Sequence, residues 1–317
     1  MSKLYCGVEI GGTKQQIAVA DENGNIIKLI TGKFPIPNGA SDILSWIEKN
    51  MSEILAAYPE ISSIGVGFGG VIETCNGRSL LSVQVKGWKD FEIKTWFEQT
   101  FNLPATVVND TVAGGYAELK NGSGRGFSNF YYTNIGTGIG GAMFLGGKTF
   151  DGIGFGGVYM GNTFVADYTS PTPGAVCRLE ELCSGTGIEA QLRKKGGVTG
   201  GMLLDLCEGD TSKLDCRMLG IAAKAGDPTA LRHIDNFART YAVSIANFVT
   251  LFSPQRVAIG GGVANLGEVI LAPVRKYVDD YVFASAKGRF DIVKCELMDE
   301  NVLVGAVLYA RDGFDAI

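Results

Sequence analysis

Asn109 and Asp110 lie at the end of a predicted buried strand, in the stretch PATVVNDTVAGGY (104–116). A carboxylate with an ordinary pKa of roughly 4 is ionised at pH 7 and can accept a proton from a hydroxyl group. The small residues that follow it leave room for a substrate. The pattern therefore favours a general base, and the alternative is that Asp110 caps a helix beginning near Thr111.

Three glycine turns each follow a predicted strand. Their backbone N–H groups are unshielded by side chains, so each turn can bind the oxygens of a phosphate. One such turn would also fit a plain hairpin, but three of them on two similar halves of the chain favour a nucleotide bound between two lobes. The turns are Gly11-Gly12-Thr13, Gly136-Thr137-Gly138 and Gly260-Gly261-Gly262.

Two other glycine motifs are excluded. Gly136, Gly138 and Gly141 match G-x-G-x-x-G, but that dinucleotide fingerprint needs a helix after it, and the following AMFLGGK reads as a strand. Lys148 lies near glycines, but Ala142 occupies the first glycine position that a P-loop requires. We therefore expect neither a dinucleotide-binding nor a P-loop site.

The elements that position the turns repeat along the chain. The order strand, glycine turn, strand occupies residues 4–21 and returns at residues 130–149. Helices are predicted from Ser41, over 88–102, from about 111, over 228–252, after Gly262 to about 284, and near the C-terminus. This repeat predicts two similar α/β lobes, residues 1–113 with 302–317 and residues 114–301.

Composition and charge limit the partners. The 317 residues carry a net charge of −5, which argues against a nucleic-acid-binding surface. No run of about 18 apolar residues indicates a membrane span, and the chain enters a strand at once, so we expect a cytoplasmic protein that does not bind membranes. Seven scattered cysteines without a C-x-x-C pair, and a single histidine, His233, argue against a zinc site of the usual kind.

Four segments together resemble the ROK family of sugar kinases, within the hexokinase–actin superfamily. The run GWKDFEIKTWFEQTFNLPATVVND is also similar to that family, and the matching pieces extend over nearly the whole chain. The resemblance implies two ribonuclease H-like lobes around a cleft, ATP with Mg²⁺, and phosphoryl transfer to a sugar hydroxyl. The four segments are VEIGGTK (8–14), VVNDTVA (107–113), NIGTGIGGAMFLGGK (134–148) and VAIGGGVANLGEVI (257–270).

The resemblance also assigns roles to single residues. Asp110 takes the position of the catalytic base, and Asn109 that of a sugar contact. Glu9 stands where the family has an Asp, so it either orients Mg²⁺ through water or points outward from its strand. Further sugar contacts are expected at Gly70, Tyr159, Asn162 and Glu180. Nucleotide contacts are expected at Gly11, Gly12, Thr13, Lys14, Gly136, Thr137, Gly138, Gly260, Gly261 and Gly262.

The chain departs from the family on the acceptor side. In GVYMGN (157–162), Tyr159 replaces a sugar-contacting Glu and Asn162 replaces a His, while Glu180 is retained as a sugar contact or a helix-surface residue. The family's Pro-Asn before the Gly-Trp has become Val83-Gln84. Because specificity rests on paired polar groups, these changes favour a non-standard acceptor, a modified or acidic sugar.

The zinc ligands of the family are also replaced. Pro171, Pro173 and Arg178 occupy the positions of its three zinc-binding cysteines, so we expect no zinc. The cysteine and histidine content leads to the same expectation.

Three functions remain open at this point. An ATP-dependent sugar kinase is favoured, and the alternative is a catalytically weak nucleotide- or sugar-binding regulator on the same fold. A DNA-binding repressor is disfavoured because the first strand begins by residue 4, which leaves no room for a helix-turn-helix. An assembly protein on the actin-like fold is the third possibility. The expected partners are a small sugar and, from the family and from base rates, a second copy of the chain.

Overall fold

The chain forms two compact units. The computed structural model describes residues 3–82, 84–155 and 157–317, so Val83 of the predicted acceptor side lies outside the described residues. Unit 1 comprises Met1–Tyr132, Ala142–Val158 and Glu296–Ile317, and unit 2 comprises Thr133–Gly141 and Tyr159–Cys295. The lobe boundaries expected from the sequence, at residues 113 and 302, stay a prediction.

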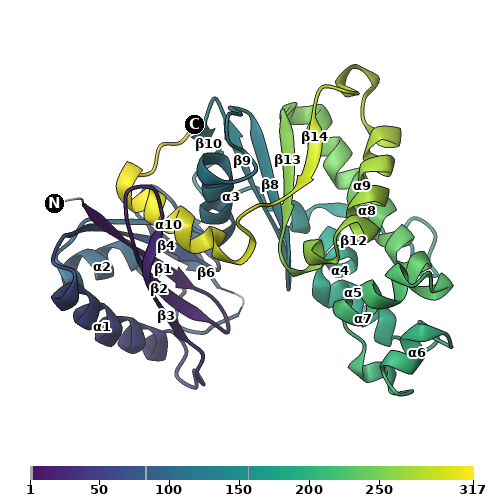
Figure 1. The fold of residues 1–317 in the computed structure, drawn as a ribbon, viewed down its shortest axis with the longest axis horizontal. Helices are drawn as coiled ribbons and strands as arrows, with labels where there is room; N and C mark the ends of the chain where they lie inside the picture. Colours follow the sequence, from purple (N-terminus) through teal and green to yellow (C-terminus); the bar gives the residue numbers. More distant parts are fainter. Residues whose placement is uncertain (1–2, 83, 156) are drawn as a thin grey trace. The chain divides into compact units, whose positions relative to one another are not determined.

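Unit 1 is built on a five-stranded sheet with the order β3-β2-β1-β4-β7 (Figure 1). β1, β2 and β3 form the expected antiparallel meander, whereas β1, β4 and β7 are parallel. Because parallel strands end at one edge, the residues that follow β1, β4 and β7 come together. The strands are β1 (Leu4–Ile10), β2 (Gln15–Ala20), β3 (Ile26–Gly32), β4 (Ile61–Phe68) and β7 (Ala105–Asn109), with a small hairpin of β5 (Val71–Glu73) and β6 (Arg78–Leu81).

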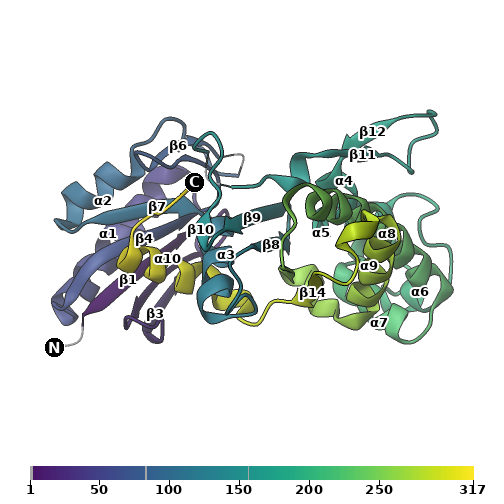
Figure 2. The same cartoon turned by 90° about the horizontal axis from the view of Figure 1, so that it is seen from above.

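Helices cover both faces of this sheet. On one face, α1 (Ala40–Ala57) and α2 (Ile93–Phe101) bury Ile43, Met51 and Phe97 against Val8 and Val66 of the strands. The other face receives α10 (Asn301–Asp312), which also packs beside α3 (Asp110–Asn121). Figure 2 shows α2 and α10 on opposite sides of β7. The apolar stripe of each helix is therefore buried against the sheet.

Glycines allow α10 to approach its neighbours at backbone distance. A Cβ on Gly65 of β4 would overlap the carbonyl oxygen of Ala306, and a Cβ on Gly305 would overlap that of Ala113 in α3. Only glycine leaves room for such contact between backbones.

The second sheet repeats the strand order of the first. Its order is β10-β9-β8-β13-β14. As in the first sheet, three consecutive strands form a meander, and two strands from later in the chain are added beside the first strand of that meander. The predicted repeat is thereby confirmed. β8 and β9 each pass from one unit into the other along the chain. The strands are β8 (Phe130–Ile135), β9 (Ile139–Leu145), β10 (Lys148–Thr149), β13 (Arg256–Gly260) and β14 (Asp291–Lys294).

The remaining elements of unit 2 are mostly helical. The predicted helix 228–252 is confirmed as α8 (Pro228–Phe252), which starts with Pro228 after the N-cap Asp227. No helix in the described ranges has the length and apolar character needed to cross a bilayer. The other elements are a hairpin of β11 (Phe164–Ala166) and β12 (Val176–Arg178), α4 (Leu179–Cys183), α5 (Gly185–Arg193), α6 (Met202–Leu206), α7 (Cys216–Lys224), α9 (Glu268–Tyr281) and the 3₁₀ turns Met160–Asn162, Thr211–Lys213, Gly262–Leu266, Ala284–Ala286 and, in unit 1, Met298–Glu300.

Two predicted helices have the wrong bounds. The helix expected over 88–102 begins only at Ile93, because the backbone of Phe91 pairs with Ser79. The helix expected after Gly262 is divided into a 3₁₀ turn and α9, since Gly267 has a φ of 78° and interrupts the helical path.

Candidate active site

The ends of three parallel strands place the predicted catalytic residues at one edge of the sheet in unit 1. Ile10 of β1 is in register with Phe68 of β4, which is in register with Asn109 of β7. The Gly69 N–H donates to the carbonyl of Ile10 at 2.9 Å, so the turns after β1 and β4 are linked. The residues that follow the three strands are Gly11, Gly69 and Asp110.

Asn109 is the N-cap of α3. Its Oδ1 accepts the N–H groups of Thr111 at 2.9 Å and Val112 at 3.4 Å. Its Nδ2 donates to the carbonyl of Gly70 at 3.0 Å, which brings two predicted sugar contacts together. The cap is therefore Asn109, and the Asp110 carboxylate is available for another role.

Asp110 is the first residue of α3 and points to the strand ends. A Cβ built on Gly69 would lie 3.4 Å from Asp110 Oδ2, so this oxygen faces the turn after β4. Burial raises the pKa of Asp110 to about 6, although hydrogen bonds from the Thr111 backbone and hydroxyl oppose this rise. The ordinary pKa expected from the sequence is therefore wrong, because the sequence does not show how far the carboxyl is removed from water.

Glu9 lies in β1 on the sheet face that receives α10, and its side chain is largely buried. Its Oε2 is 3.4 Å from Lys14 Nζ and has no hydrogen-bond partner within the described residues. Burial raises the pKa of Glu9, the charge of Lys14 opposes this, and the charges of Asp110 and Asp299 add to the rise. A buried carboxylate oxygen without a hydrogen bond fits a position that a metal-bound water would complete.

The side chain of Gln15 holds the first glycine turn through two hydrogen bonds to the backbone of Gly11. The Gly11 N–H donates to Gln15 Oε1 at 3.1 Å, and Gln15 Nε2 donates to the Gly11 carbonyl at 2.8 Å. Gln84 lies over Gly12 so closely that a Cβ on this glycine would overlap its amide. Thr13 is exposed and Lys14 half-buried beside Glu9. Sequence reasoning identified the turn and missed Gln15, which holds it.

Unit 2 contains a cavity of about 440 Å³ at the second and third glycine turns. Gly136, Thr137 and Gly262 line it, and their role as nucleotide contacts stays a prediction. Sequence reasoning missed six of its other lining residues, although Ser184-Gly185-Thr186-Gly187 repeats the small-residue pattern of the turns. These residues are Gly185, Thr186, Glu189, Asp215, Cys216 and Arg217.

Three other predicted nucleotide contacts lie apart from the lining of this cavity. Gly261 has a φ of 83°, and a Cβ on it would lie 2.5 Å from the carbonyl oxygen of Ile135, so it packs against the end of β8. Gly260 is the last residue of β13. Gly138 closes its own turn by accepting the N–H of Gly136 at 3.0 Å. These glycines shape the turns that carry Gly136 and Gly262.

The predicted acceptor residues of unit 2 gather around Ile139. The Ile139 N–H lies 3.5 Å from Glu180 Oε2, and this carboxylate also lies against Gly138. Gly161, in the 3₁₀ turn Met160–Asn162, packs on the Ile139 carbonyl. Tyr159 is half-buried and Asn162 is exposed at the two ends of this turn. Glu180 is thus directed at a glycine turn.

The segment that carries zinc cysteines in the resembling family has other contacts in this chain. Arg178 ends β12 and donates to Glu181 at 2.8 Å on the surface. Among the described residues, no three His, Cys, Asp or Glu side chains are grouped to hold a metal ion. His233 lies half-buried on α8 with its Nε2 3.1 Å from the Gly197 carbonyl.

Comparison with known proteins identifies the family of this fold and site. The sequence matches the ROK family over residues 5–313. The chain belongs to this family. The predicted family and its two-lobe hexokinase-type α/β fold are confirmed.

Several glucokinases are similar to this ROK protein over their full length. The Thermotoga maritima glucokinase is 28% identical over 315 residues, 98% of this chain and 99% of that protein. The Streptomyces coelicolor glucokinase is 28% identical over 314 residues, 98% of each protein. A structure of a ROK family glucokinase from Streptomyces griseus in complex with glucose and AMPPNP has a TM-score of 0.79 and 26% identity, and the match covers 98% of this chain and 100% of that one.

Proposed function

We propose that this ROK protein, an ATP-dependent sugar kinase, uses Asp110 as its general base. The observation that carries the proposal is the half-buried Asp110 carboxylate after the end of β7, which faces Gly69 and has a pKa raised to about 6. A base with this pKa is ionised at pH 7 and binds a proton more readily than an ordinary aspartate. The glucokinases among its relatives support this activity.

The proposed reaction transfers the terminal phosphoryl group of ATP to a sugar hydroxyl. As the new O–P bond forms, Asp110 accepts the hydroxyl proton, the bond to the leaving ADP breaks, and the proton later passes to water. Because the transition state of phosphoryl transfer is loose, the protein acts mainly by positioning and by stabilising charge. The cavity at Gly136, Thr137 and Gly262 is proposed for the nucleotide.

Further nucleotide contacts are proposed on the glycine turns of both units. Glu189 and Asp215 in the cavity of unit 2 are suited to accept hydrogen bonds from ribose hydroxyls. The remaining proposed residues are Gly11, Gly12, Thr13 and Lys14 for the phosphates, with Gly138, Gly260 and Gly261 shaping the turns.

Glu9 is proposed to hold Mg²⁺ through a water molecule. Its buried Oε2 has the Lys14 ammonium at 3.4 Å but no closer hydrogen-bond donor within the described residues, and the charge of Asp110 acts on it. A bound Mg²⁺ would neutralise phosphate charge. Zinc is not part of the proposal.

The acceptor is proposed to be a modified sugar. Asn109, Gly70, Tyr159, Asn162 and Glu180 are the proposed contacts, and Tyr159 and Asn162 differ from the Glu and His that the family pattern has there. Arg178 is paired with Glu181, which favours a neutral modified sugar over an acidic one.

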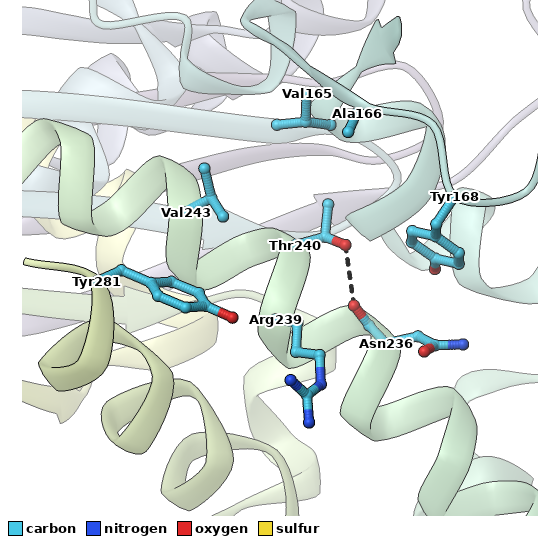
Figure 3. A pocket seen from close by; sticks show the side chains of 8 residues that line it. All are labelled: Val165, Ala166, Tyr168, Asn236, Arg239, Thr240, Val243 and Tyr281. Atoms are coloured by element: carbon cyan, nitrogen blue, oxygen red, sulfur yellow. Dashed lines mark hydrogen bonds between the residues drawn. The ribbon is translucent and has the colours of Figure 1, made fainter. Parts of the chain in front are cut away.

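We also propose a homodimer in the cytoplasm that binds no nucleic acid. Exposed apolar side chains, Val243, Tyr168 and Tyr281, surround a hollow of about 240 Å³ between α8, the end of α9 and the β11–β12 hairpin (Figure 3). Leu251 of α8 and Phe283 beyond α9 are also exposed. A two-fold interface would cover such residues. The cysteines are scattered along the chain without a C-x-x-C pair, which suits a reducing compartment.

The lobes proposed to move during turnover are residues 1–113 with 302–317 and residues 114–301. The first carries Asp110 and the second carries the nucleotide cavity. A change in their relative position during turnover would be the lobe movement common among kinases.

ADP release from Mg·ATP, measured against neutral hexoses, N-acetylhexosamines and sugar acids, tests the function. We expect turnover with one modified sugar, and Asp110→Asn should lower kcat by about 10²–10⁴-fold. The exposed Asp280→Asn on α9 is the matched control and should retain full activity.

Each other outcome has a definite meaning. Efficient phosphorylation of plain glucose would contradict the modified acceptor and leave the kinase intact. No turnover across the panel, with AMPPNP still bound, would replace the kinase with a nucleotide-binding regulator.

A further inference from the structure

The carboxylate of Glu118 in α3 is fully buried and receives four hydrogen bonds. Ser123 donates its N–H at 2.9 Å and its hydroxyl at 2.7 Å to Oε2. The N–H of Glu296 donates to Oε2 at 3.1 Å, and the N–H of Leu297 donates to Oε1 at 2.7 Å. A carboxylate is an acceptor with about four lone-pair positions, and here three donors converge on Oε2 and one on Oε1.

The donors come from two segments that are more than 170 residues apart along the chain. Ser123 follows α3, on the path by which the chain leaves unit 1 after Tyr132. Glu296 and Leu297 are the first residues after the chain returns to unit 1. One side chain therefore joins the outgoing and the returning segments of the chain.

The returning segment is anchored again at its far end. Asn301, at the start of α10, donates through Nδ2 to the Tyr132 hydroxyl at 2.8 Å, and its side chain packs on Gly114 of α3. Between these two anchor points, the returning segment borders a cavity of about 660 Å³, which is lined in part by Leu297, Glu300 and Asn121. Packing does not hold the segment on that side.

All four donors to Glu118 are neutral groups. Burying a carboxylate without a cation is costly, and only a complete set of hydrogen bonds offsets the loss of water. A Gln could not replace it, because its NH₂ group would face N–H donors. The site requires a carboxylate to hold two backbone segments at one point.

We propose that Glu118 is a positioning residue for phosphoryl transfer, which fixes the two segments where the chain passes between its units. The proposal rests on the proposed kinase function. If the segments at Ser123 and at Glu296 are not held together, a smaller fraction of the molecules adopts the conformation that binds the substrate productively. The apparent affinity for the substrate then falls in proportion to that fraction. Glu118 therefore acts on sugar KM and leaves the chemical step unchanged.

The test compares Glu118→Gln with Glu296→Gln in the full chain. Glu296 lies on the same returning segment, but its carboxylate forms an exposed ion pair with Arg125 at 2.9 Å, and such a pair contributes little. We expect Glu118→Gln to raise sugar KM about tenfold, with kcat within about threefold and an unchanged pH profile. The amides of residues 296 and 297 should exchange hydrogen at least about tenfold faster than in Glu296→Gln.

Several results would overturn the proposal. Unchanged exchange at the two amides would show that Glu118 does not hold the segment, and faster exchange with unchanged KM would show a purely structural contact. If Glu118→Gln does not fold, Ser123→Ala carries the test, and a KM equal to that of Glu296→Gln then overturns the proposal. If the wild-type protein phosphorylates no sugar, the proposed kinase function is wrong. Hydrogen exchange at residues 296 and 297 then still decides whether Glu118 holds the returning segment in place.

Discussion

Asn109 and Asp110 are adjacent in the chain, but their side chains make different contacts. Asn109 caps α3 and binds the Gly70 carbonyl, whereas Asp110 projects toward the turn at Gly69. The sequence had offered Asp110 as the alternative cap of this helix. The backbone of Asn109 is extended, with φ −62° and ψ 145°, which is the conformation of an N-cap.

The raised pKa of Asp110 predicts a pH-dependent activity. The base must be ionised to accept a proton, so kcat/KM should fall about tenfold per pH unit below a pKa of about 6 and level off above it. The pH profile of kcat/KM with the preferred sugar measures this directly. A profile that is flat from about pH 5 to pH 7 would show a carboxyl of ordinary pKa, near 4.

Removing the charge of Glu9 should weaken the response to Mg²⁺. Glu9→Gln keeps the size of the side chain but offers a weaker acceptor to a metal-bound water, so the half-saturating Mg²⁺ concentration should rise about tenfold. A titration of kcat with Mg²⁺ at fixed ATP measures the change. Glu9→Asp, which keeps the charge, is the control, and an identical titration curve for Glu9→Gln would rule out the metal role.

Local sequence patterns gave most of the elements and failed where tertiary contacts override them. The stripe of α8 and the β1–β3 meander follow simple periodicity. Residues 88–92 have helical spacing of apolar residues, yet Trp88 and Phe91 pack edge to face at 5.4 Å in a loop. That loop is held by the pairing of Phe91 with Ser79, which no local pattern reveals.

The contact between α10 and α3 predicts a sensitive glycine. Gly305→Ala places a Cβ on the Ala113 carbonyl, so the helices must separate, and we expect a loss of about 3 kcal/mol in the free energy of unfolding. Urea denaturation followed by circular dichroism measures it. Gly200→Ala is the control, since nothing lies within 4 Å of its Cβ. Equal midpoints for both variants would disprove the close packing.

At the scale of the whole molecule, the chain uses one strand order twice. Each sheet consists of a meander of three strands followed by two later strands. In both halves a glycine turn follows the first strand of the meander, at Gly11 and at Gly136. Repetition of a supersecondary unit thus placed a glycine turn after the corresponding strand in each half of the chain.

If the protein is a homodimer, charged residues introduced at the proposed interface should lower its molecular mass in solution. Leu251→Lys with Phe283→Lys should convert the dimer to a monomer in sedimentation equilibrium, because two lysines cannot be buried without partners. Ile27→Lys, at another exposed apolar position on β3, should remain dimeric. A monomeric wild type would refute the proposal.

The sequence by itself determined the family, the repeated α/β architecture, the glycine turns and the placement of Asp110 at a strand end. These features depend on local spacing and on the alternation of apolar residues, which a sequence displays directly. The tertiary structure alone decided the pKa of Asp110, the cavity residues Glu189 and Asp215, and the hydrogen bonds of Glu118 to residues 178 and 179 positions away. Desolvation and long-range hydrogen bonds arise from neighbours that are distant in the chain, so they exist only once the chain has folded.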